Sequence, residues 1–194
     1  MKARSLTVAR SMLVIALLYA TVASAVEYRD VSGKESTVMF GYTQMGVAME
    51  GKFSKFTSQL KFDPAKLNAA QAKIEIDIAS IDTGSDEANE EVVGKQWFNA
   101  QTFPTASFVS DGMKSLGGNR YEASGKLSIK GRTLDVIAPV SFQQSGTRGV
   151  FDGSFILKRL DYAIGEGEWA DVATVANEIQ IRFHFIVNAA PSKK

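Results

Sequence analysis

The segment from Val175 to Val187 constrains the fold of this chain more than any other part. Its alternate positions differ in character: Val175, Asn177, Ile179, Ile181, Phe183, Phe185 and Val187 are mostly apolar, whereas Ala176, Glu178, Gln180, Arg182, His184 and Ile186 are mostly polar. Strand side chains point to opposite faces with a period of two, so this pattern predicts a strand with one apolar and one wet face. The only histidine, His184, falls on the wet face, which argues against most catalytic and metal-binding roles.

The same alternation recurs along the chain and predicts eight strands. They are expected at residues 37–43, 56–62, 73–82, 105–110, 121–129, 134–142, 150–157 and 175–187. Turn sequences containing glycine separate the fourth to seventh of these strands and favour antiparallel hairpins: Gly117-Gly118-Asn119, Lys130-Gly131-Arg132 and Ser145-Gly146-Thr147. Pro139 cannot donate a ladder hydrogen bond, so a bulge or an edge is expected within the sixth strand.

The stretch between the third and fourth predicted strands is expected to be helical. Residues 86–96 carry negative charge near their start, and Thr83 with Asp86 fits a capping box. Trp97 and Phe98 follow directly, so this insert is expected to plug or cover one end of the sheet structure. A shorter turn is expected over residues 63–70.

The first 25 residues have the features of an export signal. Lys2, Arg4 and Arg10 precede an apolar run at 12–22, and Ala23-Ser24-Ala25 fits a cleavage site. We expect cleavage after Ala25, a periplasmic location and a single domain over residues 26–194. An uncleaved membrane anchor is the alternative, although the run is shorter than the about 20 residues of a membrane-spanning helix, and no second run approaches that length.

Composition narrows the functional classes. Without the three basic residues of the signal, 19 basic residues stand against 21 acidic ones, and no basic patch suggests a nucleic acid or an anionic lipid as partner. The absence of cysteine excludes disulfides, thiol nucleophiles and sulfur-rich metal sites. Asp86, Glu87, Glu90 and Glu91 leave a carboxylate-based hydrolase or a hard-cation site as alternatives, but they fit a solvated helix start better. We therefore expect neither an enzyme nor a metal protein.

Antiparallel strands that share an apolar side form either a sandwich or a closed barrel. A closed barrel has no exposed edges, and a barrel of eight strands holds its own side chains or one small ligand. We expect an all-β fold: an eight-stranded antiparallel barrel with a short helical insert between strands three and four. An apolar interior would suit a long hydrocarbon, at roughly 0.8 kcal/mol for each buried CH₂ group. A barrel filled by its own side chains, with a structural or stress-related accessory role, is the alternative.

Sequence motifs spread over nearly the whole mature chain carry a family resemblance. They are residues 36–56 with Gly51, Phe53 and Phe56, residues 80–84 (SIDTG), residues 97–108 with Trp97, Phe98, Phe103 and Pro104, residues 125–131 (GKLSIKG) and residues 159–165 (RLDYAIG). In these motifs the chain resembles the YceI-like family of exported lipid-binding proteins. It departs from the family pattern at Gln44, where a histidine is common, and at residues 88–91, which replace an Arg-Asp-x-His stretch. A head-group or metal role at these positions is therefore in doubt, and a different ligand head group is indicated.

The resemblance implies a lipocalin-like barrel in the periplasm. Its interior would hold an amphiphilic lipid such as a polyisoprenoid or an isoprenoid quinone, with no other cofactor, and homodimers occur in the family. The residues expected to line the ligand site are Phe40, Tyr42, Phe53, Phe56, Ile76, Trp97, Phe98, Phe103, Phe108, Leu127, Phe142, Phe155, Ile181 and Phe183. Arg159 and Asp161, spaced by two on a predicted strand, would bind the head group at the barrel mouth or form a rim ion pair. Trp169 and residues 165–168 would gate an opening or form a solvated turn.

Overall fold

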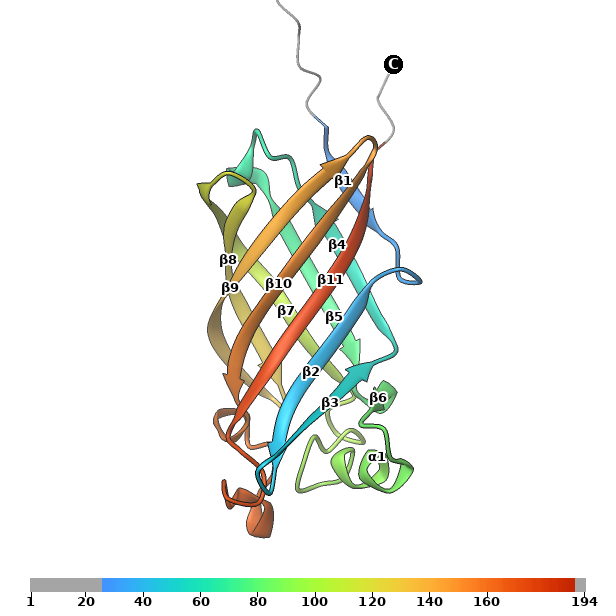
Figure 1. The fold of residues 1–194 in the computed structure, drawn as a ribbon, viewed down its shortest axis with the longest axis vertical. Coiled ribbons are helices and arrows are strands. Elements are labelled where there is room, and N and C mark those ends of the chain that lie inside the picture. Colours follow the sequence, from blue (N-terminus) through green and yellow to red (C-terminus); the bar gives the residue numbers. More distant parts are fainter. Residues whose placement is uncertain (1–25, 191–194) are drawn as a thin grey trace, which may run out of the picture.

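The computed structural model describes residues 26–190, and the predicted export signal at 1–25 lies outside the described residues. A single sheet of eleven antiparallel strands curls into a barrel with strongly tilted strands (Figure 1). The strands are β1 (Tyr28–Val31), β2 (Thr37–Gln44), β3 (Val47–Phe53), β4 (Phe56–Lys61), β5 (Gln71–Asp77), β6 (Ile81–Asp82), β7 (Thr105–Gly117), β8 (Arg120–Ile129), β9 (Arg132–Ser145), β10 (Arg148–Lys158) and β11 (Glu178–Ala189).

Short helical elements connect some of the strands. They are the α-helix α1 (Asp86–Val92) and the 3-10 turns η1 (Leu67–Ala69), η2 (Ile78–Ser80), η3 (Arg159–Tyr162) and η4 (Gly167–Ala170). All but η1 lie at the end of the barrel away from the described termini (Figure 1). We call this end, which also carries the β2–β3 hairpin, the mouth end.

The barrel closes through its first strand. The sheet follows the order β4-β5-β7-β8-β9-β10-β11-β2-β3-β6, and β1 pairs with β11 beside β2. β1 also reaches the other edge of the sheet, because the Tyr28 N–H donates to the Phe62 carbonyl (2.8 Å) and the Phe62 N–H donates to the Tyr28 carbonyl (3.0 Å). The predicted barrel is therefore confirmed as a closed ring at this end of the molecule.

The end opposite the mouth is filled by a dry cluster of large side chains, which we call the plug. Its members are all buried: Tyr28, Phe62, Tyr121, Phe142, Phe151 and Val187. The Phe62 ring meets Phe142 and Phe151 at centroid distances of 4.8 and 4.9 Å, both edge-on, the geometry that aromatic quadrupoles prefer. A second buried cluster, which includes Ile78, Leu157 and Tyr162, lies toward the mouth, so the plug is one of two packed regions of the core.

The strand count differs from the prediction of eight. β1 and β6 are too short to show an alternating pattern, and β3 carries exposed apolar residues that blur its two faces. The predicted strand at 73–82 is wrong as a continuous element, because η2 interrupts it. There the Asp77 carboxylate accepts the Ala79 N–H at 3.0 Å, which competes with the ladder and bends the chain.

The helical insert also differs in detail. α1 ends at Val92, earlier than the predicted Gln96, and its N-cap is Ser85, whose hydroxyl accepts the Ala88 N–H. Thr83 does not cap the helix as predicted. It is buried, and its hydroxyl and N–H both donate to the Asn89 side-chain carbonyl, at 2.9 and 2.8 Å.

Pro139 lies at an edge within the sheet. β9 pairs with β8 on both sides of Pro139, whereas its pairing with β10 runs from Ser145 and stops at Val140, one residue before the proline. The missing N–H therefore falls where the β9–β10 ladder has already ended, which confirms the predicted edge.

Candidate functional site

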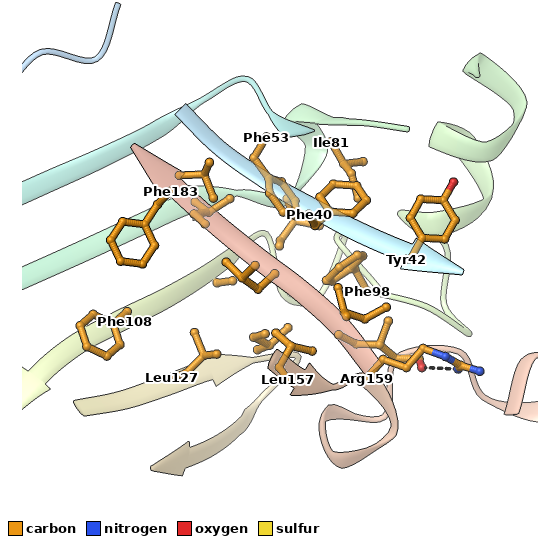
Figure 2. Close-up of a pocket in the computed structure, with 18 of the residues that line it drawn as sticks. Phe40, Tyr42, Phe53, Ile81, Phe98, Phe108, Leu127, Leu157, Arg159 and Phe183 are labelled. Carbon is orange, nitrogen blue, oxygen red and sulfur yellow. Dashed lines mark hydrogen bonds between the residues drawn. The ribbon is translucent and has the colours of Figure 1, made fainter. Parts of the chain in front are cut away.

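An apolar cavity of about 780 Å³ occupies the barrel between the plug and the mouth (Figure 2). Its wall runs from Val31 and Phe151 beneath the plug to Gln44 and Trp169 at the mouth. Nearly every strand contributes the side chains of its inward face, as the period-two alternation predicts. The interior is therefore hollow over most of its length, and the alternative of a barrel filled by its own side chains is wrong.

Most of the residues predicted to form the site line this cavity. They are Phe40, Tyr42, Phe53, Ile76, Trp97, Phe98, Phe108, Leu127, Phe155, Arg159, Ile181 and Phe183. Figure 2 shows Phe40, Phe53, Phe108 and Leu127 on opposite sides of a common space, whereas the Arg159 guanidinium extends away from it toward its hydrogen-bond acceptor. Burial raises the pKa of the Tyr42 phenol, so this hydroxyl stays neutral within the apolar wall.

Four predicted residues do not line the cavity. Phe142 belongs to the plug, and Phe56 packs behind the wall against Phe185, with ring centroids 5.6 Å apart. Phe103 lies over Gly131 in the β8–β9 turn, outside the interior. Asp161 is exposed, and its backbone carbonyl accepts a hydrogen bond from the Arg132 side chain (3.2 Å).

Arg159 and Asp161 do not form the predicted rim pair, because η3 replaces the strand that would have placed them on one face. Arg159 is only 1% exposed, and no carboxylate within residues 26–190 lies at ion-pair distance from it. Its guanidinium donates to four backbone carbonyls, those of Ile164, Gly165, Val175 and Ala176, at 2.7–3.2 Å. Burial lowers the pKa of Arg159, but an arginine keeps its charge in proteins.

These bonds give Arg159 a structural role at the mouth. All four acceptors belong to the segment between η3 and β11, so one side chain holds this segment against the end of the barrel. A guanidinium has five N–H donors, which leaves one N–H of Nη2 without an acceptor. Arg159 thus lines the cavity as a buried positive charge with one remaining donor.

Trp97 brings a second unused donor to the same place. Its side chain is buried and lines the cavity, and its Nε1 has no hydrogen-bond partner. The ring is held between the Arg159 guanidinium, whose Cζ lies 5.6 Å from the ring centroid, and Trp169, whose ring lies 5.3 Å away. A buried N–H without an acceptor costs about 1–3 kcal/mol, and an acceptor that reached the Trp97 Nε1 would remove this cost.

The opposite rim of the mouth is acidic. Glu87, Glu90 and Glu91 of α1 belong to the cavity lining, and apart from Arg159 they are its only charged members within the described residues. No group of three or more metal-ligating side chains occurs within residues 26–190. These carboxylates therefore act as a negative border of an apolar opening.

Some lining residues were not predicted as site members. Leu60, Ile179 and Phe185 lie on the predicted apolar faces of their strands, so the alternation already contained the signal for them. Ile164 and Trp169 come from the irregular segment that Arg159 holds, where no periodic pattern exists, whereas Val175 begins the predicted apolar face of the last strand. The loop around residues 165–168, for which a gate or a solvated turn was the expectation, is thus part of the mouth, and Trp169 contacts Trp97 there.

His184 lies on the outer face of β11 as predicted. Its Nδ1 lies 2.6 Å from the Asp152 carboxylate of β10, away from the cavity. Between residues 26 and 190 the structure contains no helix with the length and apolarity needed to cross a membrane.

A closed antiparallel barrel with a deep apolar cavity and a polar mouth defines a lipocalin-like protein. The YceI-like domain model matches residues 30–187, and the chain belongs to this family. A UPF0312 protein from Azotobacter vinelandii is 30% identical over 183 residues, covering 90% of this chain and 93% of the relative.

Solved structures agree with this assignment. The crystal structure of Burkholderia cenocepacia BcnA has a TM-score of 0.79 and 45% sequence identity, covering 81% of this chain and 99% of that one. A polyisoprenoid binding domain from Saccharophagus degradans has a TM-score of 0.64 and 17% identity over 86% of this chain and 99% of that domain, which shows a shared fold.

Proposed function

We propose that this protein binds a long-chain isoprenoid amphiphile, a polyisoprenoid or an isoprenoid quinone, in its barrel and carries or sequesters it in the periplasm. The apolar cavity of about 780 Å³, open at one end, is the observation that carries the proposal. Each CH₂ group that enters it gains roughly 0.8 kcal/mol, so a chain of several isoprene units has ample driving force. A barrel of the same fold, from Saccharophagus degradans, is described as a polyisoprenoid binding domain, which supports this ligand class.

The hydrocarbon chain occupies the length of the cavity in this proposal. Its contacts are the aromatic and aliphatic side chains of the wall, among them Phe40, Phe108, Leu127, Ile181 and Phe183. The plug limits how far the chain enters, because its rings are packed without space for a ligand. The ligand therefore enters tail first and leaves its head at the mouth.

The head group lies beside Trp97 and Arg159, where two buried N–H donors await an acceptor. An oxygen such as a quinone carbonyl meets this need. The carboxylates of Glu87, Glu90 and Glu91 at the rim repel an anionic head. The Arg159 guanidinium attracts one, but four of its five N–H groups already bind carbonyls, so we favour an uncharged head group over a phosphate.

Binding, not catalysis, is what the arrangement of groups supports. A hydrolase needs a nucleophile, a base and an orienting group within reach of one another. His184 is engaged with Asp152 on the outer face, and the carboxylates of α1 stand at the rim without a neighbouring base. The export signal and the periplasmic address remain part of the proposal, and N-terminal sequencing of the exported protein tests them: a chain beginning at Val26 is expected.

The decisive experiment compares two ligands and one substitution. Trp97→Phe removes the indole N–H but keeps an aromatic ring in the wall. A ubiquinone with a short isoprenoid tail should bind this variant about 3–10-fold more weakly than the wild type, the value of one hydrogen bond. Squalene, an isoprenoid hydrocarbon without a head group, should bind both proteins equally, which controls for altered packing.

The outcomes separate the two parts of the proposal. If neither ligand binds the wild type, and native mass spectrometry of protein from its own host shows a bare polypeptide, the carrier function is wrong. If both ligands bind but Trp97→Phe weakens them equally, the cavity binds isoprenoids while the head-group position is wrong. A polyprenyl phosphate that binds more tightly than the quinone would contradict the uncharged head.

A further inference from the structure

One side of the mouth carries a set of exposed apolar side chains, which we call the lip. Its members are Met45, Val47 and Met49 of the β2–β3 hairpin and Val172 of the segment before β11. Met45 is 71% exposed, Val47 59% and Val172 54%. Figure 1 shows the hairpin and this segment reaching beyond the strands at the same end of the barrel.

The two parts of the lip form one continuous surface. The Met45 N–H donates to the Thr174 carbonyl at 2.9 Å, and the Ala176 N–H donates to the Thr43 carbonyl at 2.9 Å. A β-bridge joins Gln44 to Val175, and both of these residues line the cavity. The lip is thus attached directly to the edge of the opening.

The tip of the hairpin breaks a local rule. Met45 and Gly46 form a two-residue turn with φ of 48° and 79°, and turns with two positive φ values strongly favour asparagine or aspartate before glycine. Methionine gains nothing from this backbone conformation, and its exposed side chain has no packing role. Violations of local preference without a structural gain are expected where a side chain serves a function.

The distribution of charged side chains around the lip indicates which kind of surface it binds. Residues 37–49 and 172–177 contain no charged side chain. Carboxylates outnumber basic side chains in the rest of the mouth end: Asp86, Glu87, Glu90 and Glu91 lie on α1 and Glu168 and Asp171 beside the lip, while Lys130 and Arg132 bind η3 and the residue that follows it. An uncharged apolar tip beside carboxylates suits the interface of a neutral bilayer and is repelled by anionic lipid.

We propose that the lip inserts into the surface of a neutral, zwitterionic lipid bilayer and so places the opening of the cavity against the membrane. The inference rests on the proposed function for its purpose, since an isoprenoid amphiphile then passes between bilayer and barrel without crossing water. Insertion of Met45, Val47 and Val172 leaves the acidic side of the mouth in the water layer.

Vesicle flotation tests the proposal directly. The mature protein is mixed with phosphatidylcholine vesicles and is expected to float with them. Met45→Ser/Val47→Ser/Val172→Ser should lower the partition coefficient about tenfold or more, because three apolar side chains lose their transfer from water. Phosphatidylglycerol vesicles should bind the wild type more weakly than phosphatidylcholine at low salt, and this difference should shrink as salt screens the carboxylates.

Two further variants exclude a trivial explanation. Met45→Asn should lower partition while leaving the melting temperature unchanged or raised, because asparagine suits the turn. Ile137→Ser/Ile156→Ser removes side chains that are 58% and 61% exposed on the flank of the barrel, and it should partition like the wild type.

Every result decides the question. The proposal is wrong if the wild type does not float, if the lip variant floats equally well, or if the flank variant loses as much. Loss of a dimer in the lip variant, without vesicle binding by the wild type, would assign the lip to a second copy of the chain and would also overturn it. Ubiquinone binding measured without vesicles should be the same for the lip variant and the wild type, so failure of the carrier function is recognised separately.

Discussion

The plug and the cavity wall are built from the same kinds of residue but differ in how tightly their aromatic side chains are packed. In the plug, the Phe62, Phe142 and Phe151 rings contact one another at centroid distances of 4.6–4.9 Å. In the cavity, Phe108, Phe155 and Ile181 share their inner surfaces with empty space. One end of the barrel therefore supplies packing, while the other keeps apolar surface available for a ligand.

This division separates the aromatic rings that pack against one another from the apolar side chains that border the cavity. Well-packed aromatic side chains gain dispersion contacts on every side, whereas residues around a void lose them. The half around the cavity has its own buried cluster, which includes Ile78, Tyr162 and Ile164. The bonds from Arg159 fix the segment at the mouth in addition. The three predictions below test whether the two halves differ in this way.

The largest difference is expected between two phenylalanine truncations. Phe62→Ala should lower the free energy of unfolding by about 3–5 kcal/mol, because it opens a void in a tightly packed cluster. Phe108→Ala should cost about 1–2 kcal/mol, because its ring already borders a cavity and fills less of its surroundings. Urea unfolding of ligand-free protein measures both, and equal losses would show that the two halves are packed alike.

The buried phenol of Tyr162 should make the stability of the protein depend on alkaline pH. Burial, with a contribution from Asp161, raises the pKa of Tyr162 from 10.0 to about 12. Below pH 10 both the folded and the unfolded protein keep this proton. Between pH 10 and pH 12 only the unfolded chain releases it, so stability falls as pH rises, by as much as about 3 kcal/mol.

Tyr162→Phe should remove most of this alkaline loss. Burial also raises the pKa of Tyr28 in the plug, so Tyr28→Phe should remove a further part. Unfolding curves at pH 8, 10 and 11.5 measure these effects. A Tyr162→Phe variant with the same alkaline loss as the wild type would show that this phenol ionises normally in the folded protein.

The smallest effect is expected from two matched glycines of β10. A Cβ at Gly149 would meet the Phe142 ring of the plug, and a Cβ at Gly153 would meet the Phe183 ring of the cavity wall. Gly149→Ala should cost about 1–3 kcal/mol because Phe142 has no space to move. Gly153→Ala should cost less, because Phe183 moves into the cavity, and it should weaken squalene binding. A reversed order of the two costs would place the free volume elsewhere.

The sequence predicted the sheet well because alternation reports which face of a strand is buried. It does not report height along the barrel axis, which is why Phe142 was expected in the site although it lies in the plug. The same limit explains Phe56, which faces inward but packs behind Phe185. Short strands such as β1 and β6 offer too few residues for any period to appear.

Arg159 shows what local reasoning missed at the mouth. The sequence predicts that Arg159 and Asp161 share one face of a strand. In the structure the Asn177 carbonyl accepts the Arg159 N–H (2.8 Å) and the Asn177 side chain accepts the Leu160 N–H (3.1 Å). Asn177 lies far along the chain from η3, so no local sequence pattern predicts this turn. The burial of Arg159 and the unused N–H of Trp97 became visible only when distant segments were brought together.

The closure by Tyr28 has a consequence for how the molecule is assembled. β1 seals the ring only by meeting β11, the last strand, together with Phe62. Pairings between such distant positions form late and slowly during folding. A nascent chain that lacks β11 would therefore hold an open sheet, and the closed barrel exists only once β11 has been synthesised and has met β1.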